Sequence, residues 1–278
     1  MNYMTGPVEP GALATRTGNQ KRRAVIVNIA RCALDGSEFY GEVRGADILA
    51  IEGDVFGEFE VTRRRVPRSS VRLLPPVKPG KIVAIGLNYR DHAREVNASV
   101  PDEPMMFLKA PSSMIGHDET IILPSERRTD YEGELALIIG NTAKDVGEDE
   151  ADRHILGYTC LNDVSDRVLQ KKDDQWTRAK SMDTFCPVGP LIATGIDARD
   201  LALRTTVNGV IRQSSRTSQM AFGPACLVSY VSRYMTLLPG DIISTGTPGG
   251  IGPLQDGDVV EIWIEGIGSL RNPVRRAH

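Results

Sequence analysis

The sequence predicts a mainly β protein with a few helices, of the α+β class, in which a small β-rich domain precedes a larger one. Short runs containing β-branched residues, broken by Gly and Asp, recur along most of the chain. Apolar residues at helical spacing are confined to a few segments, of which residues 225–241 are the longest. With 278 residues, of which 41% are hydrophobic, the chain is long enough to bury a large core.

The small β-rich domain is expected at residues 22–73. Its strand-like runs are residues 23–30, 39–53 and 56–62. The stretch VRLLPPVKPGK at residues 71–81 is rich in proline, which predicts a rigid linker into the larger domain at residues 74–278. Residues 1–21 are rich in Gly, Pro, Thr and Asn and lack the apolar core of a signal peptide, so we expect a disordered extension there.

The larger domain is expected to open with a buried strand at residues 81–89 and a helix at 90–98. Further strand-like runs follow at residues 120–124, 133–140, 154–164, 241–252 and 257–274. A short helix is expected at residues 148–156. A longer one is expected at 225–241, because its apolar side chains have helical spacing and the segment stops at Pro239-Gly240.

Charge, hydropathy and cysteine content exclude several classes of protein. The net charge is -3 and the pI is about 5.9, so the basic excess of a nucleic-acid-binding surface is missing. No apolar run reaches the ~20 residues that a membrane-spanning helix needs. The four cysteines lie in apolar segments and none has metal-binding or redox spacing. We therefore expect free thiols in a reducing compartment, the cytoplasm.

The stretch TDYEGELALIIG, residues 129–140, is the most informative one for function. Side chains at i and i+2 of a strand share a face, so Glu132 and Glu134 point the same way. The apolar run that follows indicates a strand that is at least half buried, where two carboxylates repel each other and lose hydration. One glutamate could be protonated, basic side chains could pair with both, a metal ion could lie between them, or the face could be a hydrated sheet edge.

A third carboxylate favours the metal. Asp163 ends another apolar, strand-like run, ILGYTCL, where functional side chains often lie. Glu132, Glu134 and Asp163 together form a hard oxygen-donor set that suits Mg²⁺, Mn²⁺ or Ca²⁺, whereas Zn²⁺ prefers His or Cys, which are missing at ligand spacing. Three carboxylates on a divalent ion leave about three octahedral positions open for water or substrate.

The stretch GLNYRDHAREVN contains a candidate general base. His92 and Glu95 are separated by three positions, so on a helix they face each other, and the carboxylate would orient the imidazole and raise its basicity. A surface helix with a chance pair is the alternative. The polar segment at residues 94–104 could act as a mobile lid.

Cationic and polar side chains near Asp163 are candidates for substrate binding. Arg167, Gln170 and Lys180 follow it in the chain, and a cation there could hold an anionic substrate or a developing negative charge. The Gly-rich turn STGTPGGIG lacks the Lys-Ser/Thr of a phosphate-binding loop, but its backbone N–H groups and the Thr247 hydroxyl could bind a carboxylate.

Taken together and in order, these stretches resemble the fumarylacetoacetate hydrolase family. The matching motifs cover nearly all of residues 74–274, and the preceding module resembles the small N-terminal domain of many bacterial members. The motifs are KIVAIGLNYRDHAREVN, MFLKAPSSMIG, DYEGELALIIG, ILGYTCLNDVSDR, RAKSMDTFCPVGP, VNGVIRQ, TLLPGDIISTGTPGGIG and GDVVEIWIEGIGSLRN.

The resemblance implies a mixed β-sandwich, barrel-like catalytic domain that usually forms a homodimer. It implies Mg²⁺ or Mn²⁺ as cofactor, with Ca²⁺ as a substitute in crystals, and a small 2-oxo acid as substrate, with no nucleic-acid or membrane partner. By motif position the implied metal ligands are Glu132, Glu134 and Asp163. The implied catalytic residues are His92, Glu95 and Lys180, and the implied substrate-binding residues are Tyr89, Arg167, Gln170 and Thr247.

Two departures from the family pattern are expected to alter the pocket. After NDVS, the usual small residue and the acid following Arg become Asp166 and Val168, which changes the charge near the pocket. The sequence SSRTSQM, residues 214–220, replaces a loop that is more acidic in many relatives.

Three functional hypotheses follow from the implied site. In the first, a metal ion acts as a Lewis acid on a 2,4-dioxo acid, and His92 with Glu95 activates water to cleave its C–C bond. In the second, the same site decarboxylates an oxaloacetate-like acid or acts as an isomerase of the 2-hydroxyhepta-2,4-diene-1,7-dioate type. In the third, the protein binds metal for structural reasons alone.

Overall fold

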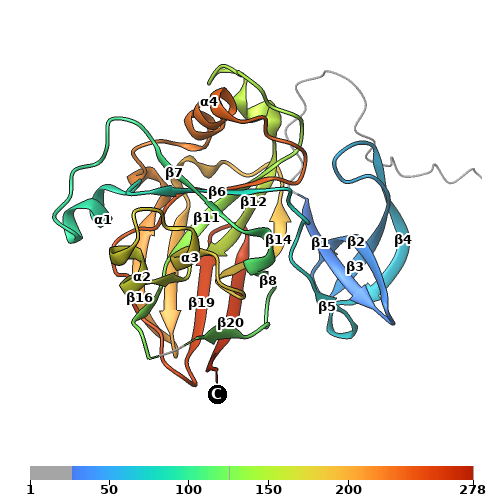
Figure 1. The fold of residues 1–278 in the computed structure, drawn as a ribbon. Coiled ribbons are helices and arrows are strands. Elements are labelled where there is room, and N and C mark those ends of the chain that lie inside the picture. The colour runs from blue at the N-terminus through green and yellow to red at the C-terminus, as the bar shows by residue number, and fades with distance from the viewer. Residues whose placement is uncertain (1–26, 125, 278) are drawn as a thin grey trace, which may run out of the picture.

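The structure, a computed structural model, describes residues 27–124 and 126–277 and confirms a mainly β fold (Figure 1). The extension expected at residues 1–21 lies outside the described residues. Figure 1 shows the N-terminal strands on one side of the larger domain, and α4 at the top of that domain. Among the described residues, no helix has both the length and the apolarity needed to cross a bilayer.

The N-terminal strands form an antiparallel meander. They are β1 (Asn28–Leu34), β2 (Ser37–Arg44), β3 (Asp47–Gly53) and β4 (Phe59–Pro67). Asp35 and Gly36 both have positive φ, 49° and 80°, which fits the tight two-residue turn between β1 and β2. The meander is not a separate sheet, because β1 also pairs with a strand of the larger domain, Ile29 opposite Ile192.

The stretch expected as a linker is packed against the meander. Its first residues form β5 (Arg72–Leu73), which pairs with β1. Leu74 and Val77 are buried, and Arg31 Nη1 donates to the Pro75 carbonyl at 3.1 Å. The proline-rich segment therefore holds the two parts of the chain together by contacts as well as by its stiffness.

The central sheet of the larger domain supplies most of the site. Together with the meander its strand order is β4-β3-β2-β1-β14-β12-β11-β17-β6-β7. These strands are β6 (Ile82–Gly86), β7 (Met105–Lys109), β11 (Gly133–Ile139), β12 (Ile155–Asn162), β14 (Cys186–Ala193) and β17 (Ile242–Ser244), and β8 (Met114–Ile115) pairs with β14. Strand β11 is buried along its whole length, as its apolar run predicts.

A second sheet packs against the first, and a small third sheet lies beside the site. The second has the order β16-β15-β19-β20-β9, and the third β13-β10-β18. Leu135 and Leu137 of β11 share one core cluster with Leu203 of β15 and Ile262 of β19. The strands of the second sheet are β9 (Ile121–Leu123), β15 (Ala202–Val207), β16 (Val210–Arg216), β19 (Val259–Ile264) and β20 (Gly268–Arg276), and those of the third are β10 (Thr129–Tyr131), β13 (Ser165–Asp166) and β18 (Gly252–Pro253).

The helices are few and short. They are α1 (Arg90–Glu95), α2 (Arg167–Lys172), α3 (Thr177–Lys180) and α4 (Pro224–Tyr234), with 3-10 turns η1 (Arg68–Ser70), η2 (Pro111–Ser113), η3 (Ala151–His154), η4 (Ala198–Asp200) and η5 (Thr217–Gln219). The helix expected at residues 148–156 is only the single turn η3. Helix α4 begins with Pro224 in its first turn and ends at Tyr234, before Pro239-Gly240, because Met235 is extended.

The four cysteines are free thiols, as expected. Cys32, Cys160 and Cys186 are buried in the core, and burial raises the pKa of each thiol above its usual value. Cys226 on α4 is half-buried. These side chains act as small apolar groups in the packing, and none of the four lines the cavity described below.

Candidate active site

Three buried carboxylates meet at the point where β11 begins and the neighbouring strand β12 ends. Glu132, Glu134 and Asp163 each offer an oxygen atom, and these atoms lie within 4.8 Å of one another. The antiparallel register places Gly133 opposite Asn162, which brings the two glutamates beside Asp163. The Asp163 N–H donates to the Glu132 carbonyl at 2.9 Å, so the backbone itself fixes this meeting point.

Gly133, between the two glutamates, has no room for a side chain. A Cβ atom there would lie 2.1 Å from Thr205 Oγ1 and 3.1 Å from Gln213 Oε1. The Gly133 N–H donates to the same Gln213 oxygen at 2.9 Å. The close approach of the second sheet therefore requires glycine here, and it sets the position of both neighbouring carboxylates.

Gly133→Ala is expected to destabilise the protein by about 1–3 kcal/mol, because the added methyl group overpacks the contact with β15. We also expect weaker divalent-cation binding, since Glu132 and Glu134 must shift with the backbone. Thermal denaturation and a Mn²⁺ titration measure the two effects. Gly57→Ala is the control, because its Cβ would meet Asp54 Oδ2 at an ordinary 3.4 Å. Equal melting temperatures for the two variants would contradict the packing account.

Glu132 is paired with two cations. Its Oε2 accepts from Lys180 Nζ at 2.8 Å, and its Oε1 accepts from Arg167 Nη2 at 2.5 Å. Burial raises the pKa of Glu132, but the Lys180 ammonium and the Arg167 guanidinium outweigh it and lower that pKa to about 2. Glu132 is therefore ionised at neutral pH.

Glu134 is placed differently, although it lies on the same face. Its Oε2 accepts from Ser244 Oγ at 2.5 Å and from the Gly246 N–H at 2.8 Å. Within residues 27–124 and 126–277 no Lys or Arg forms an ion pair with it. Burial, together with the charges of Asp163 and Glu132, raises its pKa well above the usual value. Of the three carboxylates, Glu134 is the one without an ion-pair partner in the part of the chain that the structure describes.

Asp163 is held by two lysines that approach its two oxygens. Lys109 Nζ donates to Oδ1 at 2.5 Å, and Lys180 Nζ donates to Oδ2 at 2.6 Å. Lys109 lies at the end of β7 with a fully buried side chain, and its ammonium also donates to the Lys180 carbonyl. The same ammonium thus ties β7 and α3 to the carboxylate cluster.

The cluster fits a divalent cation. Basic side chains pair with Glu132 and Asp163, whereas Glu134 has no such partner among the described residues. Its raised pKa means that Glu134 favours the protonated form without a cation, and a divalent cation would favour the ionised form. Each carboxylate oxygen can take a second partner, because it carries two lone pairs. Three oxygen donors within 4.8 Å are the type of ligand set that Mg²⁺ and Mn²⁺ prefer.

The predicted His92–Glu95 pair forms on α1. His92 Nδ1 lies 3.2 Å from Glu95 Oε2, and the His92 side chain is largely buried. The Gly250 N–H donates to the same carboxylate at 3.0 and 3.1 Å, which anchors α1 to the Gly-rich loop. With Nδ1 donating to Glu95, the Nε2 atom of the imidazole is left as a proton acceptor.

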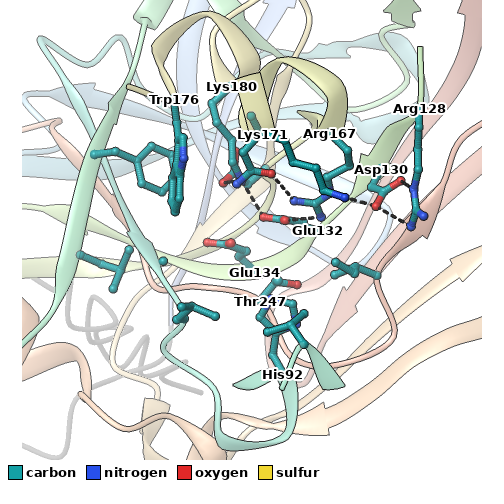
Figure 2. Close-up of a pocket in the computed structure, with 18 residues that line it drawn as sticks. His92, Arg128, Asp130, Glu132, Glu134, Arg167, Lys171, Trp176, Lys180 and Thr247 are labelled. Carbon is teal, nitrogen blue, oxygen red and sulfur yellow. Dashed lines mark hydrogen bonds and ion pairs between the residues drawn. The ribbon is translucent and has the colours of Figure 1, made fainter. Parts of the chain in front are cut away.

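A cavity of about 380 Å³ joins the carboxylates to His92. Figure 2 shows Lys180, Glu132 and Arg167 on one side of it, and His92 and Thr247 on the other. The lining residues are Ile85, Gly86, Leu87, His92, Val96, Phe107, Arg128, Asp130, Glu132, Glu134, Asp163, Arg167, Gln170, Lys171, Trp176, Lys180, Thr247 and Ile251. One chamber therefore contains the candidate metal ligands, the candidate base and several cations.

Three of the four residues expected to bind substrate line this cavity. Arg167 and Gln170 project from α2 and are joined by a hydrogen bond of 2.8 Å. Thr247 Oγ1 donates to the Gly133 carbonyl at 3.0 Å. Tyr89 is different, because it packs in the hydrophobic core, is fully buried and is not among the lining residues.

The structure shows where the two departures from the family pattern lie. Asp166 is the N-cap of α2, where it accepts the N–H groups of Val168 and Leu169, and it also accepts from Arg127 Nε at 2.6 Å. Its charge is thus used in capping, away from the cavity lining. Val168 is half-exposed. In the segment 214–220, Ser215 Oγ donates to Asp91 Oδ2 at 2.6 Å and so contacts α1.

Several site residues are not evident from the sequence patterns. Asp130 is fully buried and accepts from both Arg128 and Arg167. Asp130 lies two positions before Glu132, so strand alternation could have placed it on the same face. Lys109 ends an apolar run, where a single lysine usually indicates an exposed strand end, and no local signal points to its buried ion pair.

Comparisons with known proteins agree with this geometry. Residues 81–275 match the family model described as fumarylacetoacetate (FAA) hydrolase C-terminal, and residues 28–76 match the model described as Rv2993c-like, N-terminal. The chain therefore belongs to the fumarylacetoacetate hydrolase family, as the sequence motifs predict.

Named relatives differ in the reactions assigned to them. A 2,4-didehydro-3-deoxy-L-rhamnonate hydrolase of Sphingomonas sp. is 48% identical over 85% of this chain and 84% of its own. The mitochondrial oxaloacetate tautomerase fahd2 of Xenopus laevis is 42% identical over 74% of this chain and 69% of its own. The crystal structure of a 2-hydroxyhepta-2,4-diene-1,7-dioate isomerase from Mycobacterium marinum superposes with a TM-score of 0.84 at 44% identity, over 90% of this chain and 98% of that one.

Proposed function

We propose that this protein is a divalent-cation-dependent hydrolase that cleaves a C–C bond in 2,4-dioxo acids of the acylpyruvate type, such as fumarylpyruvate. One observation carries the proposal: a buried carboxylate cluster, in which Glu134 has no ion-pair partner among the described residues, faces an oriented histidine across a single cavity. The first element suits a Mg²⁺ or Mn²⁺ ion and the second suits general-base catalysis. The hydrolase among the relatives supports the reaction class.

When bound, the cation supplies Lewis-acid polarisation of a 2-oxo acid. The chain's own residues place the substrate and move the proton. Arg167, fixed by Asp130 and Glu132, and Gln170 present N–H donors to the anionic substrate. Thr247 contributes its hydroxyl from the side of the Gly-rich loop. Trp176 and Phe107 form an apolar wall with their rings 5.2 Å apart, which limits access of water.

The bond changes balance with water as the only co-reactant. His92 Nε2 takes a proton from water, and the water oxygen bonds to the C4 carbonyl carbon of the dioxo acid. The C3–C4 bond then breaks, and its electron pair remains with C3 as an enolate of pyruvate. Return of the proton to C3 gives pyruvate, and the acyl part leaves as a carboxylic acid. Lys180 Nζ, beside Glu132 and Asp163, stabilises the developing enolate charge.

A second reaction is supported by the tautomerase and the isomerase among the relatives. Keto–enol isomerisation of a 2-oxo acid needs a base at C3 and stabilisation of the same enolate, without an attacking water. Decarboxylation of an oxaloacetate-like acid would also use this enolate. The products separate the alternatives, because hydrolysis yields two acids, decarboxylation yields CO₂ and isomerisation yields neither.

The proposal is tested by offering acetylpyruvate, fumarylpyruvate and oxaloacetate to the protein with Mg²⁺ or Mn²⁺, before and after EDTA. Loss of dioxo-acid absorbance with release of pyruvate, and without CO₂, supports hydrolysis. CO₂ from oxaloacetate alone supports the decarboxylase, and interconversion of oxaloacetate tautomers alone supports the tautomerase. No turnover of any substrate, with a large loss of stability on chelation, would leave a structural metal site.

His92→Ala is expected to lower hydrolysis of a 2,4-dioxo acid by about 10²–10⁴-fold, because the variant lacks the base that takes the proton from water. Decarboxylation of oxaloacetate should fall much less, since loss of CO₂ needs no activated water. His154→Ala is the control, because His154 lies on η3 and outside the cavity lining. Hydrolysis by His92→Ala at the parent rate would refute the role of His92.

Homodimerisation and a cytoplasmic location complete the proposal. They are supported by the family likeness and by the free thiols, respectively. Sedimentation equilibrium measures the first directly.

A further inference from the structure

We propose that Arg128 and Lys171 bind a second carboxylate of the substrate, so that the enzyme prefers dianionic 2,4-dioxo acids, which carry a carboxylate at the far end of the acyl group, over monoanionic ones. This inference rests on the proposed function and specifies its substrate class. Both side chains line the cavity, and neither was singled out by the sequence motifs.

The charges around the cavity are the first support. Its lining contains the cations Arg128, Arg167, Lys171 and Lys180 and the carboxylates Asp130, Glu132, Glu134 and Asp163, which balance one another. Behind this lining, buried Lys109 and a divalent cation would add three positive charges, and Glu95 beside His92 adds one negative charge, which leaves an excess of two positive charges. A monoanionic substrate neutralises only part of this excess, and a dianion neutralises more of it. The cavity therefore favours substrates with two negative charges.

Lys171 is the second support, because no described residue pairs with its charge. Arg167, Gln170 and Lys171 stand at i, i+3 and i+4 of α2, so they share the face that lines the cavity. Arg167 is occupied by Asp130 and Glu132. Among the described residues, Lys171 has neither a hydrogen bond nor an ion pair, and its ammonium is available to a ligand.

Arg128 is the third support, because only part of its guanidinium is engaged. Its Nε donates to Asp130 Oδ1 at 2.8 Å and its Nη2 donates to Oδ2 at 3.0 Å. This two-point contact holds the plane of the guanidinium and leaves Nη1 without a partner in the described part of the chain. A rigid, half-exposed guanidinium with free N–H groups suits a carboxylate.

The two groups lie on the correct side of the cavity for a distal carboxylate. Figure 2 shows Arg128, Arg167 and Lys171 along one side, with His92 on the opposite side. With the 2-oxo acid head at the carboxylate cluster, an acyl chain that extends along this side would run past Lys171 and Arg167 toward Arg128. The fixed Asp130–Arg167 pair lies between Arg128 and the cluster.

The test compares fumarylpyruvate, a dianion, with acetylpyruvate, a monoanion, using the full chain with Mn²⁺. For Lys171→Met and for Arg128→Gln, kcat/KM for fumarylpyruvate should fall about 10- to 100-fold, as expected for loss of a charge-assisted hydrogen bond. The loss should appear mainly in KM. For acetylpyruvate the change in Lys171→Met should stay within about threefold, because the methyl group of acetylpyruvate does not reach Lys171. In Arg128→Gln the loss should be larger on fumarylpyruvate than on acetylpyruvate, since this variant also releases Asp130 from one of its partners.

Lys172→Met is the matched control, since this neighbouring lysine lies outside the cavity lining and the variant removes the same charge from α2. It should leave both substrates unchanged. Equal losses on the two substrates, no loss on fumarylpyruvate, or the same loss in Lys172→Met would each overturn the inference. So would a parent enzyme that cleaves the two acids with equal kcat/KM, and that result would leave the proposed hydrolase intact. A parent that cleaves neither acid overturns both proposals.

Discussion

Glu134→Gln is expected to abolish divalent-cation binding and turnover while leaving the cation-free protein at least as stable as the parent. The amide oxygen can still accept from Ser244 Oγ and the Gly246 N–H, so the local hydrogen bonds survive. The substitution removes a buried carboxylate that no Lys or Arg of the described chain pairs with, and whose pKa burial and two acidic neighbours raise. Loss of a residue that only supports a metal ligand typically lowers cation affinity about 10- to 100-fold. Glu134 would contact the cation itself, so we expect a larger loss.

Glu132→Gln is the matched comparison for this prediction. It removes the same charge from the same strand face, but it breaks the ion pairs with Lys180 and Arg167 and leaves both cations buried. We expect a loss of about 3–5 kcal/mol in the free energy of unfolding. Chemical denaturation in EDTA and a Mn²⁺ titration measure both variants. Equal destabilisation of the two variants, or retained Mn²⁺ affinity in Glu134→Gln, would contradict the assignment of Glu134 as the carboxylate that needs a cation.

Lys109→Met is expected to cost about 3–5 kcal/mol of stability, because it leaves Asp163 Oδ1 as a buried acceptor with no partner. Methionine matches the length of lysine, so packing changes little. The substituted protein also lacks the bond from Nζ to the Lys180 carbonyl, which connects β7 to α3. We therefore expect weaker Mn²⁺ binding as well, because Asp163 and Lys180 lose a common anchor.

A double variant and a control separate the pair from general packing. In Lys109→Met/Asp163→Asn the buried charge is removed with its partner, so part of the lost stability should return. Lys81→Met breaks another ion pair, Lys81 with Asp241, outside the cavity lining. It should lower stability without changing Mn²⁺ affinity. An unaltered melting temperature for Lys109→Met, or no recovery in the double variant, would show that the ion pair contributes little.

The residues that sequence analysis could place are those with a local periodic signal. Strand alternation put Glu132 and Glu134 on one face, and the end of an apolar run indicated Asp163. Helical spacing paired His92 with Glu95, and α1 bears this out with Nδ1 and Oε2 3.2 Å apart. Each of these predictions needs only a few consecutive residues, and so the sequence contained enough information.

Features that depend on contacts between distant segments could not be read in this way. The pairing of β1 with β14, which merges the small N-terminal meander with the central sheet, depends on a register between residues far apart in sequence. Lys109 reaches Asp163 across 54 positions, and nothing in its neighbours distinguishes it from a surface lysine. The family resemblance implied that Tyr89 binds the substrate, but Tyr89 packs in the hydrophobic core.

The positions of the cavity-lining cations Arg128 and Lys171 also depend on contacts between distant segments. Arg128 and Lys171 stand in charged stretches that are usually solvent-exposed, and only the fold brings both to one cavity. Asp130 was closer to being predictable, because it shares the alternation of Glu132 and Glu134. Its role in holding Arg128 and Arg167 depends on β10 and α2 meeting beside the cavity.

The most direct test of the central claim is the rate of fumarylpyruvate cleavage by EDTA-treated protein as Mn²⁺ is added back. The account predicts negligible cleavage without the ion, a rate that rises to a plateau at one Mn²⁺ per chain, and pyruvate and fumarate as the products. Glu134→Gln should stay inactive across the same titration. Full-rate cleavage by the metal-free protein, or a parent that remains inactive at saturating Mn²⁺, would contradict a catalytic cation held by Glu132, Glu134 and Asp163.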